Sequence, residues 1–151
     1  MGDLDEIVQA IPIREKLFIG GDLNGHVGTT RYAFDSVHGG FNFGERNEPG
    51  NSILNFALSY DLILTNTWFR KRESHLITFR TGSSASQIDF YLIRKVDRGC
   101  CIDCKVVPGE SVVTQHRPLI LDVWIRRRFR KIKRKLDLKI KWWSFCRSSS
   151  T

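Results

Sequence analysis

The sequence has 151 residues and a formal net charge of +8, and 41% of its residues are hydrophobic. This length suits one domain, and the apolar content is ordinary for a globular protein. No run of about 18 apolar residues occurs, which argues against a membrane span, and residues 1–13 lack the basic start of a signal peptide. We therefore expect an intracellular protein that is not secreted, has no membrane partner and keeps its cysteines reduced.

The positive charge is concentrated near the end of the chain. Residues 1–125 hold 13 Lys/Arg against 15 Asp/Glu, whereas residues 126–151 hold 11 Lys/Arg against Asp137 alone. We expect residues 1–125 to form a domain and residues 126–151 to form a basic tail or linker. Such asymmetry indicates an arm that meets a polyanion, and a solvated linker or a nuclear-import signal explains it equally well.

The first half of the chain predicts two helices separated by a strand and a long loop. Residues 3–11 have one apolar face and stop before Pro12, which indicates a short helix. Residues 17–20 predict a buried strand, and residues 21–50 predict a long surface loop of the kind that is often functional. A second helix is expected over residues 51–59, capped by Asn51 or Ser52, with a buried stripe of Ile53, Leu54, Ala57 and Leu58.

The second half predicts strands. These are expected over residues 61–65, 76–79, 87–93, 104–107 and 119–124, with a turn over residues 82–86. Beyond them, the spacing of Phe129, Ile132, Leu136 and Ile140 predicts a basic amphipathic helix. The domain should therefore combine at least five strands with one or two helices.

Three separated patches contain residues suited to catalysis. Asp22 and Asn24 follow the first strand within a glycine-rich segment, where a carboxylate and an amide can point into one cleft; residues of these types are also common turn formers. Asp89 lies in the middle of an apolar strand, where a carboxylate needs a partner, so an ion pair and a catalytic role are equally expected. His116 precedes the last strand and could supply that partner, because an Asp–His pair fixes the imidazole tautomer.

The cysteines offer a weaker signal. Cys101 and Cys104 have the C-x2-C spacing of zinc sites, but no second pair lies nearby. Ordinary thiols at a strand end are the simpler interpretation.

Together, the patches Gly21-Asp22-Leu23-Asn24, Ser86-Gln87-Ile88-Asp89-Phe90 and Thr114-Gln115-His116-Arg117-Pro118 resemble, in order, three motifs of the endonuclease/exonuclease/phosphatase family. The segments between them, such as Gly44-Glu45-Arg46-Asn47 and Thr65-Asn66-Thr67-Trp68, resemble its branch from LINE-type retrotransposons. Within that branch, the sequence is most similar to the plant group called craniofacial development protein 2-like. The resemblance covers residues 4–125.

The resemblance implies an α/β (α+β) fold, specifically part of a four-layer α/β/β/α sandwich, and hydrolysis of phosphodiester bonds in DNA with Mg²⁺ or Mn²⁺. By motif, Asp22 would orient or deprotonate the attacking water and contribute to metal binding, and Asn24 would hold the scissile phosphate. His116 would bind the phosphoryl oxygens as negative charge develops, and Asp89 would orient His116.

Two departures limit what the resemblance implies. Gln115 stands where the wider family has an aspartate, so it is a doubtful metal ligand. The family's first half also carries an Asn and a metal-anchoring Glu that no residue here matches. We therefore expect a truncated domain that binds Mg²⁺ weakly, exposes apolar sheet surface and has reduced activity. A second chain that supplies the missing half-domain is a candidate partner.

The main alternative to this nuclease is a non-catalytic remnant that binds nucleic acid through its basic tail. The residues that would do so are Arg126, Arg127, Arg128, Arg130, Lys131, Lys133, Arg134 and Lys135. Either interpretation makes DNA the partner and favours a nuclear location. A third interpretation keeps the fold but changes the substrate to a sugar or lipid phosphate, and the LINE-like segments argue against it.

Overall fold

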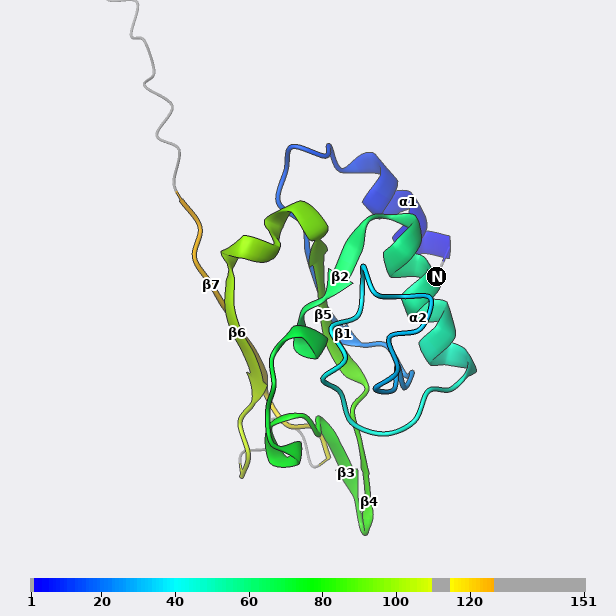
Figure 1. The fold of residues 1–151 in the computed structure, drawn as a ribbon, viewed down its shortest axis with the longest axis vertical. Helices are drawn as coiled ribbons and strands as arrows, with labels where there is room; N and C mark the ends of the chain where they lie inside the picture. The colour runs from blue at the N-terminus through cyan, green and yellow to red at the C-terminus, as the bar shows by residue number, and fades with distance from the viewer. Residues whose placement is uncertain (1, 110–114, 127–151) are drawn as a thin grey trace, which may run out of the picture.

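The computed structural model describes residues 2–109 and 115–126. Within these ranges, helices and antiparallel strands are combined (Figure 1), so the predicted mixed α/β class is confirmed. The helices are α1 (Gly2–Ala10) and α2 (Glu48–Ser59), with three 3-10 turns, η1 (Thr65–Trp68), η2 (Glu73–His75) and η3 (Lys95–Cys100). The strands are β1 (Phe18–Asp22), β2 (Leu62–Leu64), β3 (Phe79–Thr81), β4 (Ser84–Ser86), β5 (Asp89–Arg94), β6 (Cys101–Val106) and β7 (Leu119–Val123). The basic helix predicted over residues 129–140 lies outside the described ranges.

The central sheet has the order β1-β5-β2, and both pairings are antiparallel. In the register of β1 against β5, Phe18 lies opposite Ile93 and Asp22 lies opposite Asp89. The end of β1 and the start of β5 therefore bring two carboxylates to the same end of the sheet.

Two smaller antiparallel sheets accompany the central one. β3 pairs with β4 in a hairpin that projects from one end of the molecule, and β6 pairs with β7 alongside the central sheet (Figure 1). The turn predicted over residues 82–86 is wrong in part, because Ser84–Ser86 pairs with Phe79–Thr81. Backbone pairing outweighs the low strand preference of serine there.

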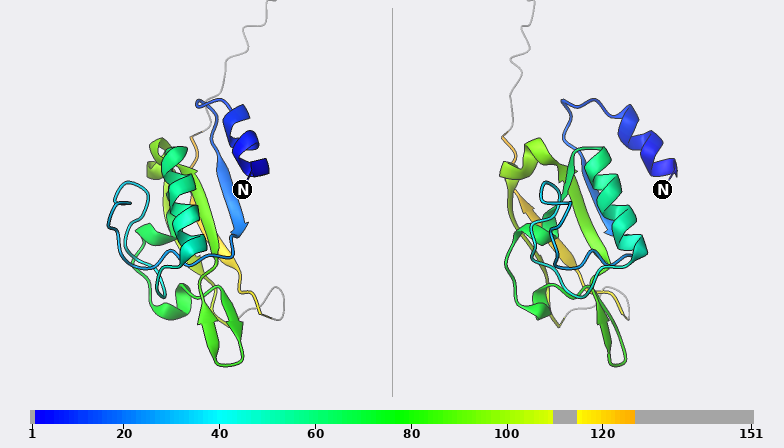
Figure 2. Two further views of the ribbon diagram at one scale, coloured as in Figure 1. Left: turned by 90° about the vertical axis from the view of Figure 1, so that its right-hand side faces the viewer. Right: turned by 45° about the vertical axis from the view of Figure 1, so that its right-hand side comes forward.

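The main core lies between α2, the loop of residues 23–47 and one face of the central sheet. Figure 2 shows α2 and this loop beside the sheet. Phe90 and Leu92 of β5 contribute to this core, and the neighbouring Ile93 is fully buried outside it. The strand predicted over residues 17–20 is confirmed by β1, but its predicted burial is wrong. Among the described strands, β1 pairs with β5 alone at the edge of the sheet, and Phe18 remains 38% exposed.

The start of α2 also differs from the prediction. The cap is Asn47, whose side chain accepts a hydrogen bond from the Gly50 backbone N–H, and a proline follows in the first turn. Proline is tolerated in the first turn because a backbone N–H at that position would have no partner within the helix. Leu58, predicted to be buried, is 47% exposed, and Phe56 is buried instead. No helix in the described ranges has the length and apolar character needed to cross a bilayer.

Candidate active site

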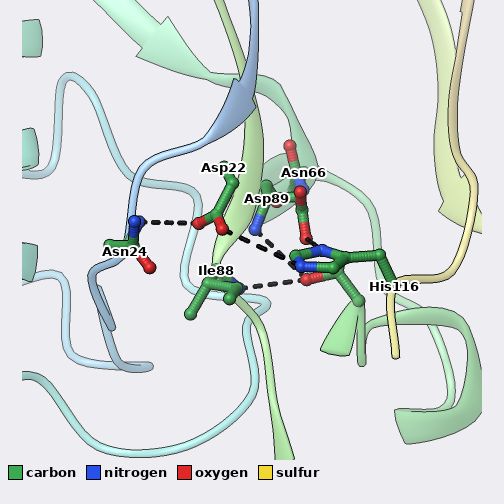
Figure 3. A network of polar contacts seen from close by, with 7 residues as sticks. Asp22, Asn24, Asn66, Ile88, Asp89 and His116 are labelled. Atoms are coloured by element: carbon green, nitrogen blue, oxygen red, sulfur yellow. Dashed lines mark hydrogen bonds and ion pairs between the residues drawn. The ribbon is translucent and has the colours of Figure 1, made fainter. Parts of the chain in front are cut away.

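Three segments that are far apart in the sequence meet at one end of the central sheet (Figure 3). Asp22 ends β1, Asp89 begins β5, and His116 lies just before β7, where its backbone bridges to Phe79 of β3. His116 Nδ1 lies 3.2 Å from Asp89 Oδ2, and His116 Nε2 lies 4.0 Å from Asp22 Oδ2. The imidazole therefore stands between two carboxylates.

The geometry assigns the tautomer of His116. A carboxylate can only accept, so Nδ1 carries the proton that is donated to Asp89. When the ring is neutral, Nε2 then presents its lone pair toward Asp22. The Asp89 side chain is 18% exposed, against 32% for His116 and 33% for Asp22. Asp89 is therefore the most buried of the three side chains, and Asp22 and His116 are more open to solvent.

Asp22 is held by a local turn. The backbone N–H of Asn24 donates to Asp22 Oδ1 at 2.8 Å, and Asn24 adopts the left-handed conformation with a φ of 50°. Asparagine tolerates this conformation better than most residues. The turn occupies one oxygen of Asp22, and the other is directed at His116. Asn24 itself lies on the side of Asp22 away from the imidazole (Figure 3).

Two buried polar residues that the sequence analysis did not select position Asp89. The Thr78 hydroxyl oxygen accepts hydrogen bonds from the backbone N–H groups of Ile88 and Asp89, at 3.0 and 3.1 Å. The Asn66 amide donates to the Asp89 carbonyl at 3.0 Å and accepts from the Tyr91 N–H at 2.9 Å. Both side chains are almost fully buried, and buried polar groups are normally paired. The sequence signal that could have identified Thr78 and Asn66 is their position next to apolar residues of predicted strands.

The segment around His116 is anchored on both sides. The backbone N–H of Arg117 donates to the Thr78 carbonyl at 2.8 Å, and the N–H of Arg80 donates to the Gln115 carbonyl at 2.9 Å. The Phe79 ring packs edge-on against the imidazole, with 4.9 Å between the ring centroids. β3 therefore fixes both the backbone and the ring plane of His116.

Asp22, Asp89 and His116 line an open cavity of about 690 Å³. It is lined by Gly20, Gly21, Asp22, Asp89, Tyr91, His116, Arg117, Pro118 and Leu119. The Tyr91 ring lies directly over Gly20, where an added Cβ would come within 2.4 Å of a ring carbon. The glycine therefore lets the aromatic wall lie close to the strand, and Arg117 adds a positive charge to the lining.

The residues available for a metal are few. Gln115 is exposed, does not line this cavity, and donates from its side-chain amide to the Thr81 hydroxyl at 3.3 Å. Asp89 is engaged with His116, which leaves Asp22 as the main free carboxylate. Across residues 2–109 and 115–126, no group of three or more His, Cys, Asp or Glu side chains is arranged to hold a metal ion. This donor set does not by itself fit a resident Mg²⁺.

The described cysteines include the C-x2-C pair, Cys101 and Cys104, whose spacing is that of zinc sites. Cys100, Cys101 and Cys104 are free thiols. Burial raises the pKa of the Cys104 thiol to about 12 and also raises that of Cys101. Among the described residues, no group of three or more possible metal ligands includes these cysteines.

Of the basic residues predicted to bind nucleic acid, only Arg126 falls within the described part of the chain, where it is exposed. The other seven, from Arg127 to Lys135, lie outside it.

Comparison with known proteins supplies a relative but no matching family profile. Over 120 residues, 78% of this chain, the sequence is 31% identical to craniofacial development protein 2 of Bos taurus and 30% identical to that of Tragulus javanicus. These relatives are animal proteins, whereas the resemblance pointed to a plant group. The matched segment is 20% and 21% of their lengths, so the chain spans about a fifth of the curated relatives it matches. The chain is thus similar to part of craniofacial development protein 2.

Proposed function

We propose that this chain carries the phosphate-handling part of an endonuclease-like phosphodiesterase of the endonuclease/exonuclease/phosphatase family, of the LINE type, acting on DNA. The observation that supports the proposal most directly is the placement of His116 between Asp89 and Asp22 in an open cavity. The sequence similarity to craniofacial development protein 2 agrees with the motif resemblance but does not identify an activity.

The arrangement suits attack on a phosphate. The 4.0 Å between His116 Nε2 and Asp22 Oδ2 exceeds a direct hydrogen bond and leaves room for a water that donates to Asp22 and contacts His116. In this proposal Asp22 orients the attacking water, and protonated His116 donates from Nε2 to the phosphoryl oxygen as negative charge develops. Asp89 holds the imidazole in place, and Asn24 is assigned to the scissile phosphate by the motif resemblance.

The limited donor set shapes the expected activity. Asp22 offers one free carboxylate, so a Mg²⁺ or Mn²⁺ ion would need further ligands from the substrate phosphates, from water or from another polypeptide. We therefore propose weak metal binding and a low rate for this chain alone. A second chain that completes the site, and a nuclear location, remain part of the same proposal.

The test is nicking of supercoiled plasmid DNA in Mg²⁺. We expect slow nicking that EDTA abolishes and that His116→Ala reduces at least about a hundredfold, the range typical of a positioned acid or base. His26→Ala is the matched control, because His26 lies in the neighbouring loop and does not line the cavity. Nicking that survives His116→Ala would refute the assignment.

The competing function is a non-catalytic nucleic-acid-binding protein. The absence of a three-ligand metal cluster from the described residues favours it. Folded protein that binds DNA but shows no nicking above the EDTA control would establish this alternative.

A further inference from the structure

A second pocket lies at the opposite end of β1 and β7 from the candidate active site. It has a volume of about 610 Å³ and is lined by Arg14, Lys16, Gly99, Cys100, Trp124 and Arg126. Arg14 and Lys16 precede β1, and Trp124 and Arg126 follow β7, so these segments meet near the upper end of the molecule in Figure 1. We propose that this pocket binds a single-stranded segment of nucleic acid, with a base stacked on Trp124 and phosphates bound by the three cations.

Hydrogen bonds from a buried arginine fix the backbone that carries Arg14 and Lys16. Arg94 is 7% exposed, and its guanidinium donates to the carbonyl oxygens of Glu15 and Ile11 at 3.1 and 3.0 Å. This buried cation ties the connection between α1 and β1 to the end of β5. It therefore holds the segment that presents Arg14 and Lys16.

The pocket has an excess of positive charge. The Lys16 ammonium pairs with Asp97 and lies 3.5 Å from the Cys100 sulfur, and the hydrogen bond to Asp97 raises the pKa of Lys16. Asp97 is the carboxylate that offsets part of this charge. Arg14 and Arg126 are exposed and form no salt bridge with any other described residue, so their guanidinium groups are available to an anion.

Trp124 gives the pocket an aromatic surface. Its side chain is 68% exposed, although its backbone N–H donates to the Cys100 carbonyl at 2.7 Å and so fixes its position. By contrast, the Trp68 ring already stacks against the Arg98 guanidinium, 3.8 Å from its centroid. A held but uncovered indole beside cations is the combination that single-strand-binding sites use, because every unpaired base has a face to stack.

The occupant follows from this chemistry. An acidic peptide would use the cations but would not need the indole, and duplex DNA keeps its bases stacked internally. A single strand uses both features. Arg126 also begins the stretch of residues 126–141, which contains ten Lys/Arg.

The experiment measures binding of a fluorescein-labelled 12-nucleotide oligo-dT, its oligo-U counterpart and a blunt duplex to the full chain by anisotropy in EDTA. Oligo-dT and oligo-U distinguish DNA from RNA, and EDTA separates binding from any nicking. Trp124→Ala should weaken single-strand binding at least about tenfold, Trp124→Phe should restore most of it, and the duplex should change less than about twofold. Arg14→Glu should lower the slope of log K against log salt by about 0.7, the value for one phosphate contact on a single strand.

Matched controls remove general effects of charge and aromatic content. Tyr32→Ala removes a side chain that is 82% exposed, and Arg70→Glu makes the same charge change at an exposed position away from the pocket. Neither should change the affinity more than about twofold by this mechanism. Equal losses for Trp124→Ala and Tyr32→Ala, or equal losses on single strand and duplex, would overturn the proposal. Circular dichroism of each variant confirms that it is folded.

Discussion

The buried His38 should make this protein lose stability as the pH falls from neutral. Its ring is 0% exposed and lies inside the loop that joins β1 to α2. The Nε2 atom lies 2.9 Å from the Gly28 carbonyl oxygen, and Nδ1 accepts from the Gly40 backbone N–H at 2.9 Å. These contacts require one neutral tautomer, because the ring must donate at Nε2 and accept at Nδ1.

The magnitude follows from the pKa. Burial lowers the pKa of His38 from 6.5 to about 4 in the folded protein. Between these values the unfolded chain takes up a proton that the folded chain does not, so stability falls as the pH falls. The stabilisation from the neutral ring is complete above the unfolded pKa and is lost through the window down to about pH 4. Linkage gives a loss of about 2 kcal/mol between about pH 7 and pH 5, and about 3 kcal/mol by about pH 4.

The assay is urea unfolding followed by tryptophan fluorescence at about pH 7, 6 and 5, with His38→Gln as the test variant. Glutamine cannot be protonated in this range, so the free energy of unfolding of His38→Gln should fall by about 2 kcal/mol less than that of the wild type between about pH 7 and pH 5. At neutral pH the variant should be less stable than the wild type, because it loses the hydrogen bonds of the ring. His26→Gln, in the same loop and partly exposed, is the matched control.

Parallel loss of stability in the wild type and in His38→Gln between about pH 7 and pH 5 would refute this reasoning. It would mean that the folded protein protonates His38 without a cost, and that the two contacts to Gly28 and Gly40 do not select the neutral ring.

Two further predictions concern the support of the candidate site. Gly50→Ala places a Cβ 1.7 Å from the His26 carbonyl oxygen, so the loop must move away from α2. We expect thermal unfolding to show a loss of about 3 kcal/mol in the free energy of unfolding. Gly99→Ala is the control and should cost less than about 1 kcal/mol, because nothing lies within 4 Å of the added Cβ. Equal effects of the two alanines would contradict the close packing. Asp89→Asn should slow nicking about tenfold to a hundredfold with unchanged DNA affinity, because a neutral amide lacks the negative charge with which Asp89 stabilises the protonated imidazole. Asp35→Asn, at a side chain that is 72% exposed, is the control, and an equal effect there would remove Asp89 from the mechanism.

Several features could be predicted from local pattern alone. The helix α2 and the strands β2, β5 and β7 occur within a few residues of their expected positions, because apolar periodicity reports which face a segment buries. The unusual position of Asp89 within an apolar strand also indicated that it needs a partner. His116 is that partner, at 3.2 Å.

Other features depended on contacts between distant segments. The start of α2 has a local signal in Asn47 and the proline that follows it, but the hydrogen bond that Asn47 also accepts from the His26 N–H, 21 residues earlier, is a contact between distant segments. β1 has the apolar sequence of a buried strand, but its place at the sheet edge leaves Phe18 exposed. Burial of a strand depends on what lies next to it, and sequence does not state its neighbours.

The same distinction applies to the candidate site. The sequence by itself determined which residues carry useful chemistry, because the side chains of Asp22, Asp89 and His116 set the available charges and proton donors. Only the tertiary structure decided how they combine: the antiparallel register of β1 and β5 places the two carboxylates together, and β3 holds His116 between them. It also excluded Gln115 from the cavity and revealed Asn66 and Thr78 as supports. Distances and hydrogen bonds between remote segments arise from packing of the whole chain, which local sequence patterns do not contain.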